Sequence, residues 1–241
     1  MSIPHRIPEP ISLGDPAVTD ILEWDVKSWF PALRYWDDTV EWNQVEHVLD
    51  LGARRGGLSL YAALKGVSVV CSDRTGTEAS ARPLHDKYGL AESITYADID
   101  ATDIPYEGAF DLVMFKSVIG GVGYGDRKDR QHEVFRQIYK ALKPGGMLIF
   151  AENLTASRVH RFLRKQFTRW GADWRYVTVP ELREFTSEFS RTEIRTTGVS
   201  ATFGRTEKQR SVLATIDRVI LNAAVPFGAR YIAYGCAVKG K

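Results

Sequence analysis

The strongest constraint on the fold of this chain is an alternation, through its middle, of short β-rich runs with segments of helical period. Five runs carry the β signal: 45–51, 67–73, 93–99, 110–115 and 147–152. None of them contains proline, which central strands exclude because proline lacks the N–H that a ladder needs. Strands that alternate with helices are typical of βαβ units with parallel strands. The sequence therefore predicts an α/β fold, a doubly wound and mostly parallel sheet with helices on both faces.

Helix candidates occupy the gaps between these runs. In the clearest one, apolar residues recur at helical spacing from Val134 to Leu142, and the segment Lys143-Pro144-Gly145-Gly146 follows as a stop signal. Helices of this kind are the usual crossovers between parallel strands. The candidates lie at about 56–65, 77–89 and 126–142.

The N-terminal part differs from this middle. Residues 1–16 are proline-rich without periodicity and predict an extended arm, whereas the aromatic-rich residues 17–44 predict one or two helices. These helices cover either the core or a substrate pocket. We therefore divide the chain into an arm with cap helices, residues 1–44, and a cofactor-binding domain, residues 45–241, with substrate-side insertions around 118–130 and 154–190.

The C-terminal part adds helices and two further strands. A basic helix is predicted at about 156–169, a helix near Pro180, a strand at 192–200, a helix with an apolar stripe between Val212 and Ile220, and a final strand within 229–239. We expect the last two strands to pair antiparallel at the edge of the sheet. The basic helix has three interpretations: a crossover packed on the sheet with a solvated basic face, a rim that recruits an anionic substrate, or a peripheral contact with an anionic membrane.

Composition limits the compartment and the partners. The net charge of +2 is too small to indicate a nucleic-acid partner by itself. Cys71 and Cys236 lie in apolar runs and predict buried, reduced thiols. We see no basic-then-apolar leader, no apolar stretch of about 18 residues and no metal-ligand spacing among the histidines. We therefore expect a cytoplasmic protein without a transmembrane segment or a metal site, and we leave its oligomeric state open.

Three acids follow three successive β runs. Asp50 precedes a loop that contains Gly52 and Gly56, and these glycines let the backbone turn tightly in front of a helix N-terminus. The charge of Asp50 suits an amino group and would repel a pyrophosphate. Asp73 ends the next run, where an acid accepts hydrogen bonds from ribose hydroxyls, and Asp100 follows the third run, where it can accept from the amine of adenine. Together they indicate adenosine joined to an amino acid.

The order of these motifs resembles the class I methyltransferases that depend on S-adenosylmethionine (SAM). The resemblance rests on LDLG…G, SD, DATDIPY, FDLV and LKPGG, and it covers roughly residues 45–152. It implies a seven-stranded sheet whose last strand is antiparallel, and SAM as the cofactor. Where the family loop commonly has its middle glycine, this chain has Arg54. The cofactor-binding residues that the resemblance implies are Asp50, Gly52, Ala53, Gly56, Asp73, Arg74, Asp100, Ala101, Lys116 and Ser117.

A narrower similarity favours a small-molecule acceptor. The segments ARRGGLSL, WDVKSWFPALRYW and ARYIAYGCAVK are similar to methyltransferases of bacterial surface-polysaccharide or natural-product pathways. The expected reaction is methyl transfer to a small-molecule acceptor that carries a hydroxyl, a saccharide or a secondary metabolite. The alternatives are methylation of a lipid, protein or nucleic acid, and a SAM-binding scaffold whose site Arg54 has spoiled. A nicotinamide-dependent oxidoreductase is disfavoured by the glycine spacing.

Candidate catalytic and substrate-binding residues lie near the predicted carboxyl edge of the sheet. A hydroxyl acceptor gains from a general base, and Glu152, at the end of the fifth run, is the first choice, although a helix cap or an ion pair explains it equally well. His132 is the second choice, with a surface histidine as its alternative. Tyr124 and Asp126, in the glycine-rich 118–131 loop, are candidate substrate contacts. The basic helix adds Arg158 and His160 as contacts for an acceptor, one that is anionic in the rim interpretation.

Overall fold

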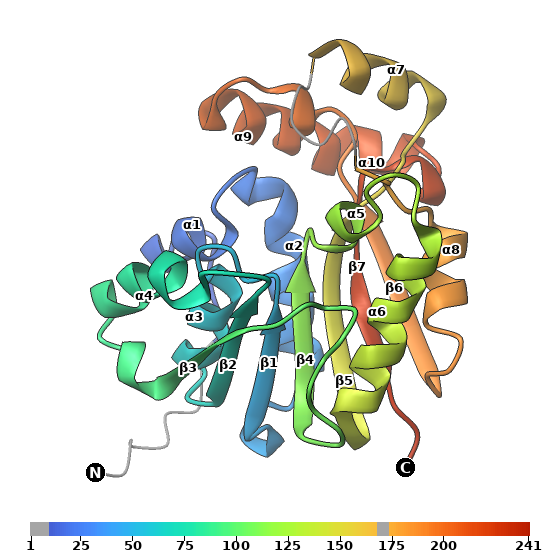
Figure 1. The fold of residues 1–241 in the computed structure, drawn as a ribbon. Coiled ribbons are helices and arrows are strands. Elements are labelled where there is room, and N and C mark those ends of the chain that lie inside the picture. The colour runs from blue at the N-terminus through green and yellow to red at the C-terminus, as the bar shows by residue number, and fades with distance from the viewer. Residues whose placement is uncertain (1–9, 168–173) are drawn as a thin grey trace.

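The core of the structure is a sheet of seven strands in the order β3-β2-β1-β4-β5-β7-β6 (Figure 1). We describe residues 10–167 and 174–241 of a computed structural model. Strands β1 to β5 pair in parallel, while β7 runs antiparallel to both β5 and β6. The predicted doubly wound sheet with an antiparallel last strand is confirmed. The strands are β1 (His47–Leu51), β2 (Ser68–Asp73), β3 (Ile94–Asp98), β4 (Phe110–Lys116), β5 (Leu142–Asn153), β6 (Arg191–Thr197) and β7 (Ile232–Val238).

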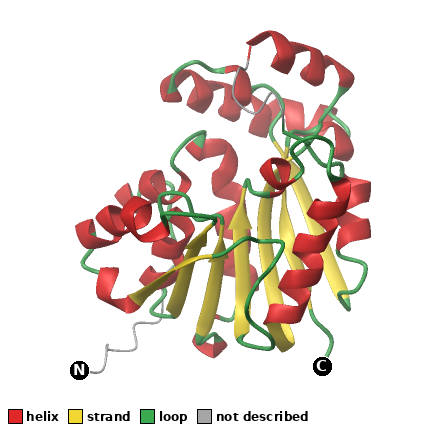
Figure 2. Ribbon diagram, in the orientation of Figure 1, coloured by secondary structure: helices red, strands yellow, loops and turns green. Residues whose placement is uncertain are grey.

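Helices lie on both faces of this sheet and beyond one end of it (Figure 2). Residues 1–9 of the predicted arm, and residues 168 and 169 of the predicted basic helix, lie outside the described residues. The α-helices are α1 (Pro16–Leu22), α2 (Val26–Thr39), α3 (Gly57–Leu64), α4 (Thr77–Lys87), α5 (Ile119–Val122), α6 (Lys128–Ala141), α7 (Arg158–Phe167), α8 (Val179–Phe185), α9 (Glu207–Ile216) and α10 (Asn222–Ala224). Short turns of other helix types are η1 (Trp42–Gln44), η2 (Ala91–Ser93), η3 (Ala201–Phe203), η4 (Asp217–Leu221) and η5 (Phe227–Ala229).

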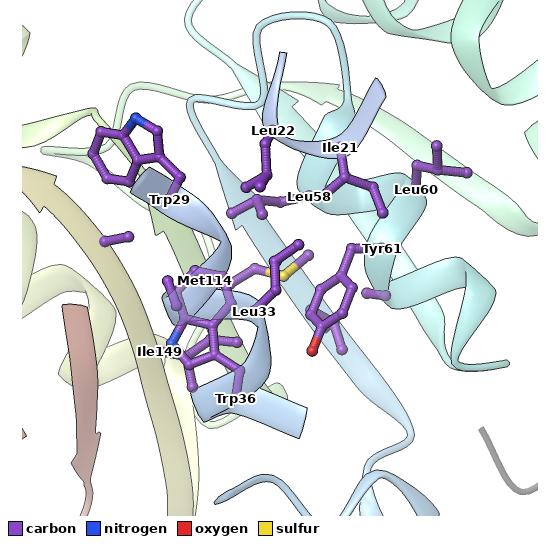
Figure 3. Packing of buried hydrophobic residues seen from close by; sticks show 14 of the residues in the cluster. Ile21, Leu22, Trp29, Leu33, Trp36, Leu58, Leu60, Tyr61, Met114 and Ile149 are labelled. Atoms are coloured by element: carbon purple, nitrogen blue, oxygen red, sulfur yellow. The ribbon is translucent and has the colours of Figure 1, made fainter. Parts of the chain in front are cut away.

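Alternate residues along the central strands supply two separate cores. Met114 of β4 and Ile149 of β5 face α1, α2 and α3, whose side chains pack together in Figure 3. The aromatic segment supplies Trp29 and Trp36 from α2, both fully buried. A buried side chain of this kind contributes on the order of 1.5–3 kcal/mol. The cap helices therefore form one layer of the core and also lead the chain toward the end of the sheet.

The opposite face is covered by α6 and α8. Phe115 of β4 and Phe150 of β5 point to this side, and Phe135 of α6 packs edge-on against Phe115 with ring centroids 6.0 Å apart. Helix α8 begins with a capping box in which the Thr178 hydroxyl accepts from the Glu181 N–H. Because both faces are covered, β1 and β4 are buried along most of their length, as central parallel strands require.

Helix α7 does not pack on the sheet, and this corrects the crossover interpretation of the basic helix. It lies with α9 beyond the carboxyl ends of the strands (Figure 1). Its apolar Val159 and Phe162 are 69% and 64% exposed, whereas His160 and Arg164 are buried. The reversal arises because His160 stacks on Tyr231, with ring centroids 5.4 Å apart, and the Arg164 guanidinium donates to the Leu154 carbonyl.

The predicted apolar stripe of the following helix is also largely exposed. Leu213 packs against the core, but the remaining members of the stripe are exposed. The exposed members are Val212, Ile216, Val219 and Ile220. We call the outward sides of α7, α9 and η4 the crest.

Two further observations concern the chain as a whole. Cys71 and Cys236 are both buried and free, as their apolar surroundings predicted. Among the residues that the structure describes, no helix combines the length and the apolar character needed to cross a bilayer.

Candidate active site

A cleft of about 1010 Å³ opens at the carboxyl ends of β1, β2 and β4. Open α/β sheets bind ligands at this edge, where the order of the strands reverses, and here the reversal lies between β1 and β4. Ten of the residues proposed from the sequence line the cleft: Asp50, Gly52, Ala53, Asp73, Arg74, Asp100, Ala101, Lys116, Ser117 and Tyr124.

Asp50 is the most buried acid of the cleft. It is 1% exposed, and its Oδ2 accepts a hydrogen bond from the Ser59 hydroxyl at 2.7 Å. Burial raises the pKa of this carboxyl to about 7. A positively charged group bound in the cleft would offset the cost of ionising Asp50. The site therefore suits an amino group at this position.

Two residues of the loop after β1, Gly52 and Arg54, have a left-handed backbone conformation. Gly52 has φ +65°, and a Cβ there would lie 2.5 Å from Val118 Cγ2, so only glycine fits. Arg54 has φ +52° although it is not glycine, a conformation that costs about 1–2 kcal/mol. Its side chain is 67% exposed and pairs with Glu23 at 3.2 Å. Arg54 thus holds, at the cost of strain, a left-handed backbone conformation that favours glycine.

Asp73 and Asp100 complete a row of three carboxylates. Asp73 Oδ2 accepts from the Arg54 N–H at 2.9 Å and its Oδ1 from the Arg74 N–H at 2.7 Å, which orients the carboxylate at the end of β2. Asp100 Oδ1 accepts from the Thr102 N–H at 2.9 Å. An acid buried beside a glycine turn, followed by two oriented acceptors, fits the amino group, the ribose hydroxyls and the adenine amine of an adenosyl amino acid.

The other side of the cleft is formed by the segment between α1 and α2. Glu23 and Asp25 have φ +66° and +48°, and the two strained residues flank Trp24. Asp25 is buried, and its Oδ2 accepts from the Tyr231 hydroxyl at 2.5 Å. Trp24 packs edge-on against Trp29 with ring centroids 5.4 Å apart. Backbone strain of this kind persists where the surrounding structure holds it, and here it positions Trp24 in the cleft wall.

Lys116 ends β4 between the two sides. Its Nζ lies 5.0 Å from the ring centroids of both Trp24 and Trp29. Burial lowers the pKa of its ammonium to about 8. The remaining wall adds three arginines, an indole and a threonine from distant segments: Arg127, Arg130, Arg210, Trp174 and Thr202.

Glu152 and His132 lie outside the cleft wall. Glu152 is fully buried, and its Oε2 accepts from the Val118 and Ile119 N–H groups at 2.8 and 2.7 Å. It therefore caps the short helix α5, and burial raises the pKa of its carboxyl to about 7. His132 stacks on Phe185 of α8, with ring centroids 5.5 Å apart. Neither geometry brings a titratable group to an acceptor.

The remaining proposed residues are also not brought to the cleft. Asp126 pairs with Arg175 at 2.9 Å, and Arg158 is exposed on α7. His160 is buried, and burial lowers the pKa of its imidazole to about 3. Gly56 packs closely against His85 and does not line the cleft; a Cβ there would lie 2.5 Å from His85 Nε2.

The sequence did not predict most of the cleft wall opposite the three carboxylates. Trp24 lies in the aromatic-rich segment that was expected to cover either the core or a pocket, so its aromatic character was an indication of this role. Trp174, Thr202 and Arg210 follow β5 in the chain and carry no motif; only the tertiary fold brings them to the end of β4.

Comparisons with known proteins match the part of the chain that carries the three carboxylates. Residues 49–150 match the family model described as a methyltransferase domain. The chain is 37% identical over 134 residues to a ubiquinone/menaquinone biosynthesis C-methyltransferase of Methylococcus capsulatus. That alignment covers 51% of this chain and 48% of the relative, so the chain spans about half the length of the curated relative it matches.

Solved structures with low sequence identity share the fold. A phosphoethanolamine N-methyltransferase 2 of Haemonchus contortus, in complex with S-adenosyl-L-methionine, superposes with a TM-score of 0.61 at 18% identity, over 93% of this chain and 56% of that one. A [4+2]-cyclase superposes with a TM-score of 0.57 at 17% identity, over 95% and 93% of the two chains. At such identities the likeness concerns the fold alone, and the fold serves more than one chemistry.

Proposed function

We propose that this chain, a member of the class I SAM-dependent methyltransferases, transfers a methyl group from SAM to a small-molecule acceptor. One observation supports this more than any other. Asp50, Asp73 and Asp100 lie at or just beyond the carboxyl ends of three neighbouring strands and line one cleft together with the Gly52 turn. This is the arrangement that an adenosyl amino acid needs, and it differs from the phosphate cradle of a nicotinamide site.

Each carboxylate has a distinct task in this proposal. Asp50 neutralises the amino group of the cofactor, Asp73 accepts from the ribose hydroxyls, and Asp100 accepts from the adenine amine. Bound SAM supplies a methyl group already activated on a sulfonium. The chain therefore chiefly aligns an acceptor with that methyl group and excludes water, and alignment alone can supply roughly 7–11 kcal/mol of the barrier.

For the acceptor, we propose a hydroxyl-bearing small molecule, a saccharide or a secondary metabolite, that carries a negative charge. Arg210 lines the acceptor side of the cleft and has only a weak ion pair, 3.5 Å from Glu207. Arg127 and Arg130 also line the cleft, where they pair with Asp129 and Asp100. Guanidinium groups are well suited to carboxylates and phosphates. Trp24 and Trp174 add flat aromatic surface to the same wall.

Calorimetry tests the cofactor proposal directly. We expect micromolar binding of SAM and S-adenosylhomocysteine and no binding of NAD. Asp73→Ala should weaken SAM binding by about 1–3 kcal/mol, because the ribose loses a charged acceptor. Asp98→Ala is a matched control: Asp98 ends β3 and holds the N-terminus of α4, so its loss should lower stability and leave SAM affinity largely unchanged. NAD binding, or equal SAM affinity in Asp73→Ala and the wild type, would contradict the assignment.

The scaffold alternative makes a different prediction. A non-catalytic protein would bind SAM and transfer no labelled methyl group to any nucleotide sugar, glycan or metabolite in a screen. Arg54 gives this alternative little support, because its backbone adopts the conformation that glycine would adopt and its side chain is largely exposed.

A further inference from the structure

Lys116 is the only lysine among the described residues that line the cleft, and it is not engaged by a partner of opposite charge. Glu23 pairs with Arg54 at 3.2 Å, and Asp50, Asp73 and Asp100 belong to the cofactor side. Glu152 is occupied by backbone N–H groups. Lys116 remains, and within the described part of the chain no carboxylate lies within ion-pair distance of its Nζ.

A second lysine of the same chain shows what is unusual about Lys116. Lys65 also lies over two aromatic rings, 5.9 Å from Trp42 and 5.5 Å from Tyr61, but its Nζ is 2.6 Å from Asp37. That site is a closed ion pair beneath the cap helices. Lys116 has the aromatic rings without the carboxylate, and it opens on the cleft.

The surroundings of Lys116 make the neutral amine accessible near physiological pH. Burial lowers the pKa of its ammonium to about 8 from an ordinary value of 10.5. Five charged groups face it: Glu23 and Asp25 from the α1–α2 segment, Asp50 from β1, Glu152 from β5, and Arg54 from the loop after β1. The acids raise the pKa and Arg54 lowers it, so burial outweighs the net effect of the charges. A base works best when its pKa lies near the working pH.

We propose that Lys116 is the general base that removes the proton from the acceptor hydroxyl. This inference rests on the proposed methyl transfer. The neutral amine of Lys116 takes the hydroxyl proton and becomes an ammonium. The acceptor oxygen keeps the electron pair of its O–H bond and uses it to bond the methyl carbon, while the pair of the breaking carbon–sulfur bond stays on sulfur. The ammonium then returns its proton to water.

The two indoles give this base a specific advantage. Their faces attract a cation, by about 0.5–2 kcal/mol depending on solvent access. The charge on Nζ develops as the proton arrives, so the indoles of Trp24 and Trp29 stabilise the ammonium as it forms. An ion pair such as that of Lys65 would keep the amine protonated before the reaction.

The first experiment measures the amine without any acceptor. Native protein is labelled with acetic anhydride over a range of pH, and mass spectrometry follows the Lys116 peptide. The same lysine in urea-unfolded protein is the control. We expect half-maximal labelling near pH 8 in the native protein and near 10.5 in the unfolded one. A native midpoint at or above the unfolded one, or no native labelling below that pH, would overturn the proposal.

The second experiment separates a base from a fixed positive charge. Transfer of labelled methyl from SAM into a small-molecule metabolite extract is compared in the wild type, Lys116→Arg, Lys116→Ala and the exposed-lysine control Lys87→Met. We expect a loss of roughly 10²–10⁴-fold in both Lys116 variants. Added methylamine should restore transfer in Lys116→Ala, and increasingly so as its neutral form grows with pH. Lys87→Met should match the wild type.

The outcomes of this experiment separate a failure of the Lys116 proposal from a failure of the proposed function. S-adenosylhomocysteine binding within about threefold of wild type shows that a variant is folded and that its cofactor side is intact. Retained transfer in Lys116→Arg would overturn the base and identify a cationic anchor. Absence of SAM binding in the wild type itself would instead overturn the proposed function.

Discussion

The two sides of the cleft are built in different ways. On the cofactor side, Asp50, Asp73 and Asp100 lie at or just beyond the carboxyl ends of three consecutive parallel strands. Each carboxylate is oriented by a neighbour close in sequence: the Ser59 hydroxyl, the Arg74 N–H or the Thr102 N–H. On the acceptor side, Trp24, Lys116 and Arg210 come from three distant segments. The cofactor side thus follows from the order of strands and turns, while the acceptor side exists only in the complete tertiary fold.

Their mechanical support differs as well. On the cofactor side, Asp50 lies in the buried central strand β1 and Asp73 ends its neighbour β2, while Asp100 follows the edge strand β3. The acceptor side rests on the strained residues Glu23 and Asp25 and on α9, whose outer face is exposed. We therefore expect changes on the cofactor side to act mainly on SAM affinity, and changes on the acceptor side to act on turnover.

The largest effect is expected from Asp50→Asn. Loss of a buried, paired charge costs about 2–5 kcal/mol, so SAM affinity measured by calorimetry should fall by two to three orders of magnitude. Asp111→Asn is the matched control, because Asp111 lies at the amino end of β4 and pairs with Lys143 at 2.6 Å. SAM affinity that falls equally in both variants would mean that the comparison reports general destabilisation.

The same carboxyl predicts a pH dependence of the ligand-free protein. The pKa of Asp50 is raised from 3.8 to about 7, so its contribution to stability is complete below about pH 4 and is lost as the pH rises through about 7. The loss is on the order of 1–4 kcal/mol. Urea unfolding at about pH 5 and pH 8 should show it in the wild type and show less of it in Asp50→Asn. An identical pH profile in the two proteins would contradict the assignment.

The sequence predicts the positions of some site residues and not of others. Asp50, Asp73 and Asp100 were predictable because the carboxyl ends of parallel strands meet at one edge. Glu152 was placed correctly at the end of β5, but only the structure shows that its oxygens accept from the Val118 and Ile119 N–H groups. The buried face of α7 could not be predicted, since His160 and Arg164 are buried by stacking on Tyr231 and by the Leu154 carbonyl, contacts that no periodicity encodes.

A smaller effect should mark the acceptor side. Trp24→Leu keeps much of the side-chain volume but removes one of the two indoles over Lys116. The ammonium loses about 0.5–1 kcal/mol of attraction, so the midpoint of Lys116 acetylation should fall by about half a pH unit. SAM affinity should stay the same. A midpoint that rises would show that solvent entry outweighs the indole.

Arg54→Gly compares the strained loop with the family pattern. Glycine adopts φ +52° without the steric penalty, so the free energy of unfolding should rise by up to about 1 kcal/mol, less its larger unfolded-state entropy. SAM affinity should change by less than about threefold. Thermal unfolding and calorimetry measure both, and a marked gain in affinity would mean that Arg54 hinders the cofactor.

The smallest effect is expected at the crest. Phe162→Ser and Val219→Ser replace exposed side chains, so the free energy of unfolding should change by no more than about 0.5 kcal/mol. Phe135→Ala, on the buried face of α6, is the contrast, with an expected loss of about 3–5 kcal/mol. A loss above about 1 kcal/mol at the crest would show that this surface is covered in solution.

A crystal structure with S-adenosylhomocysteine tests most directly where the cofactor binds. We expect its amino group against Asp50, its ribose hydroxyls against Asp73 and its adenine amine against Asp100, with Lys116 left free toward the acceptor. Electron density for the ligand away from these three carboxylates, or an amino group paired elsewhere, would contradict it.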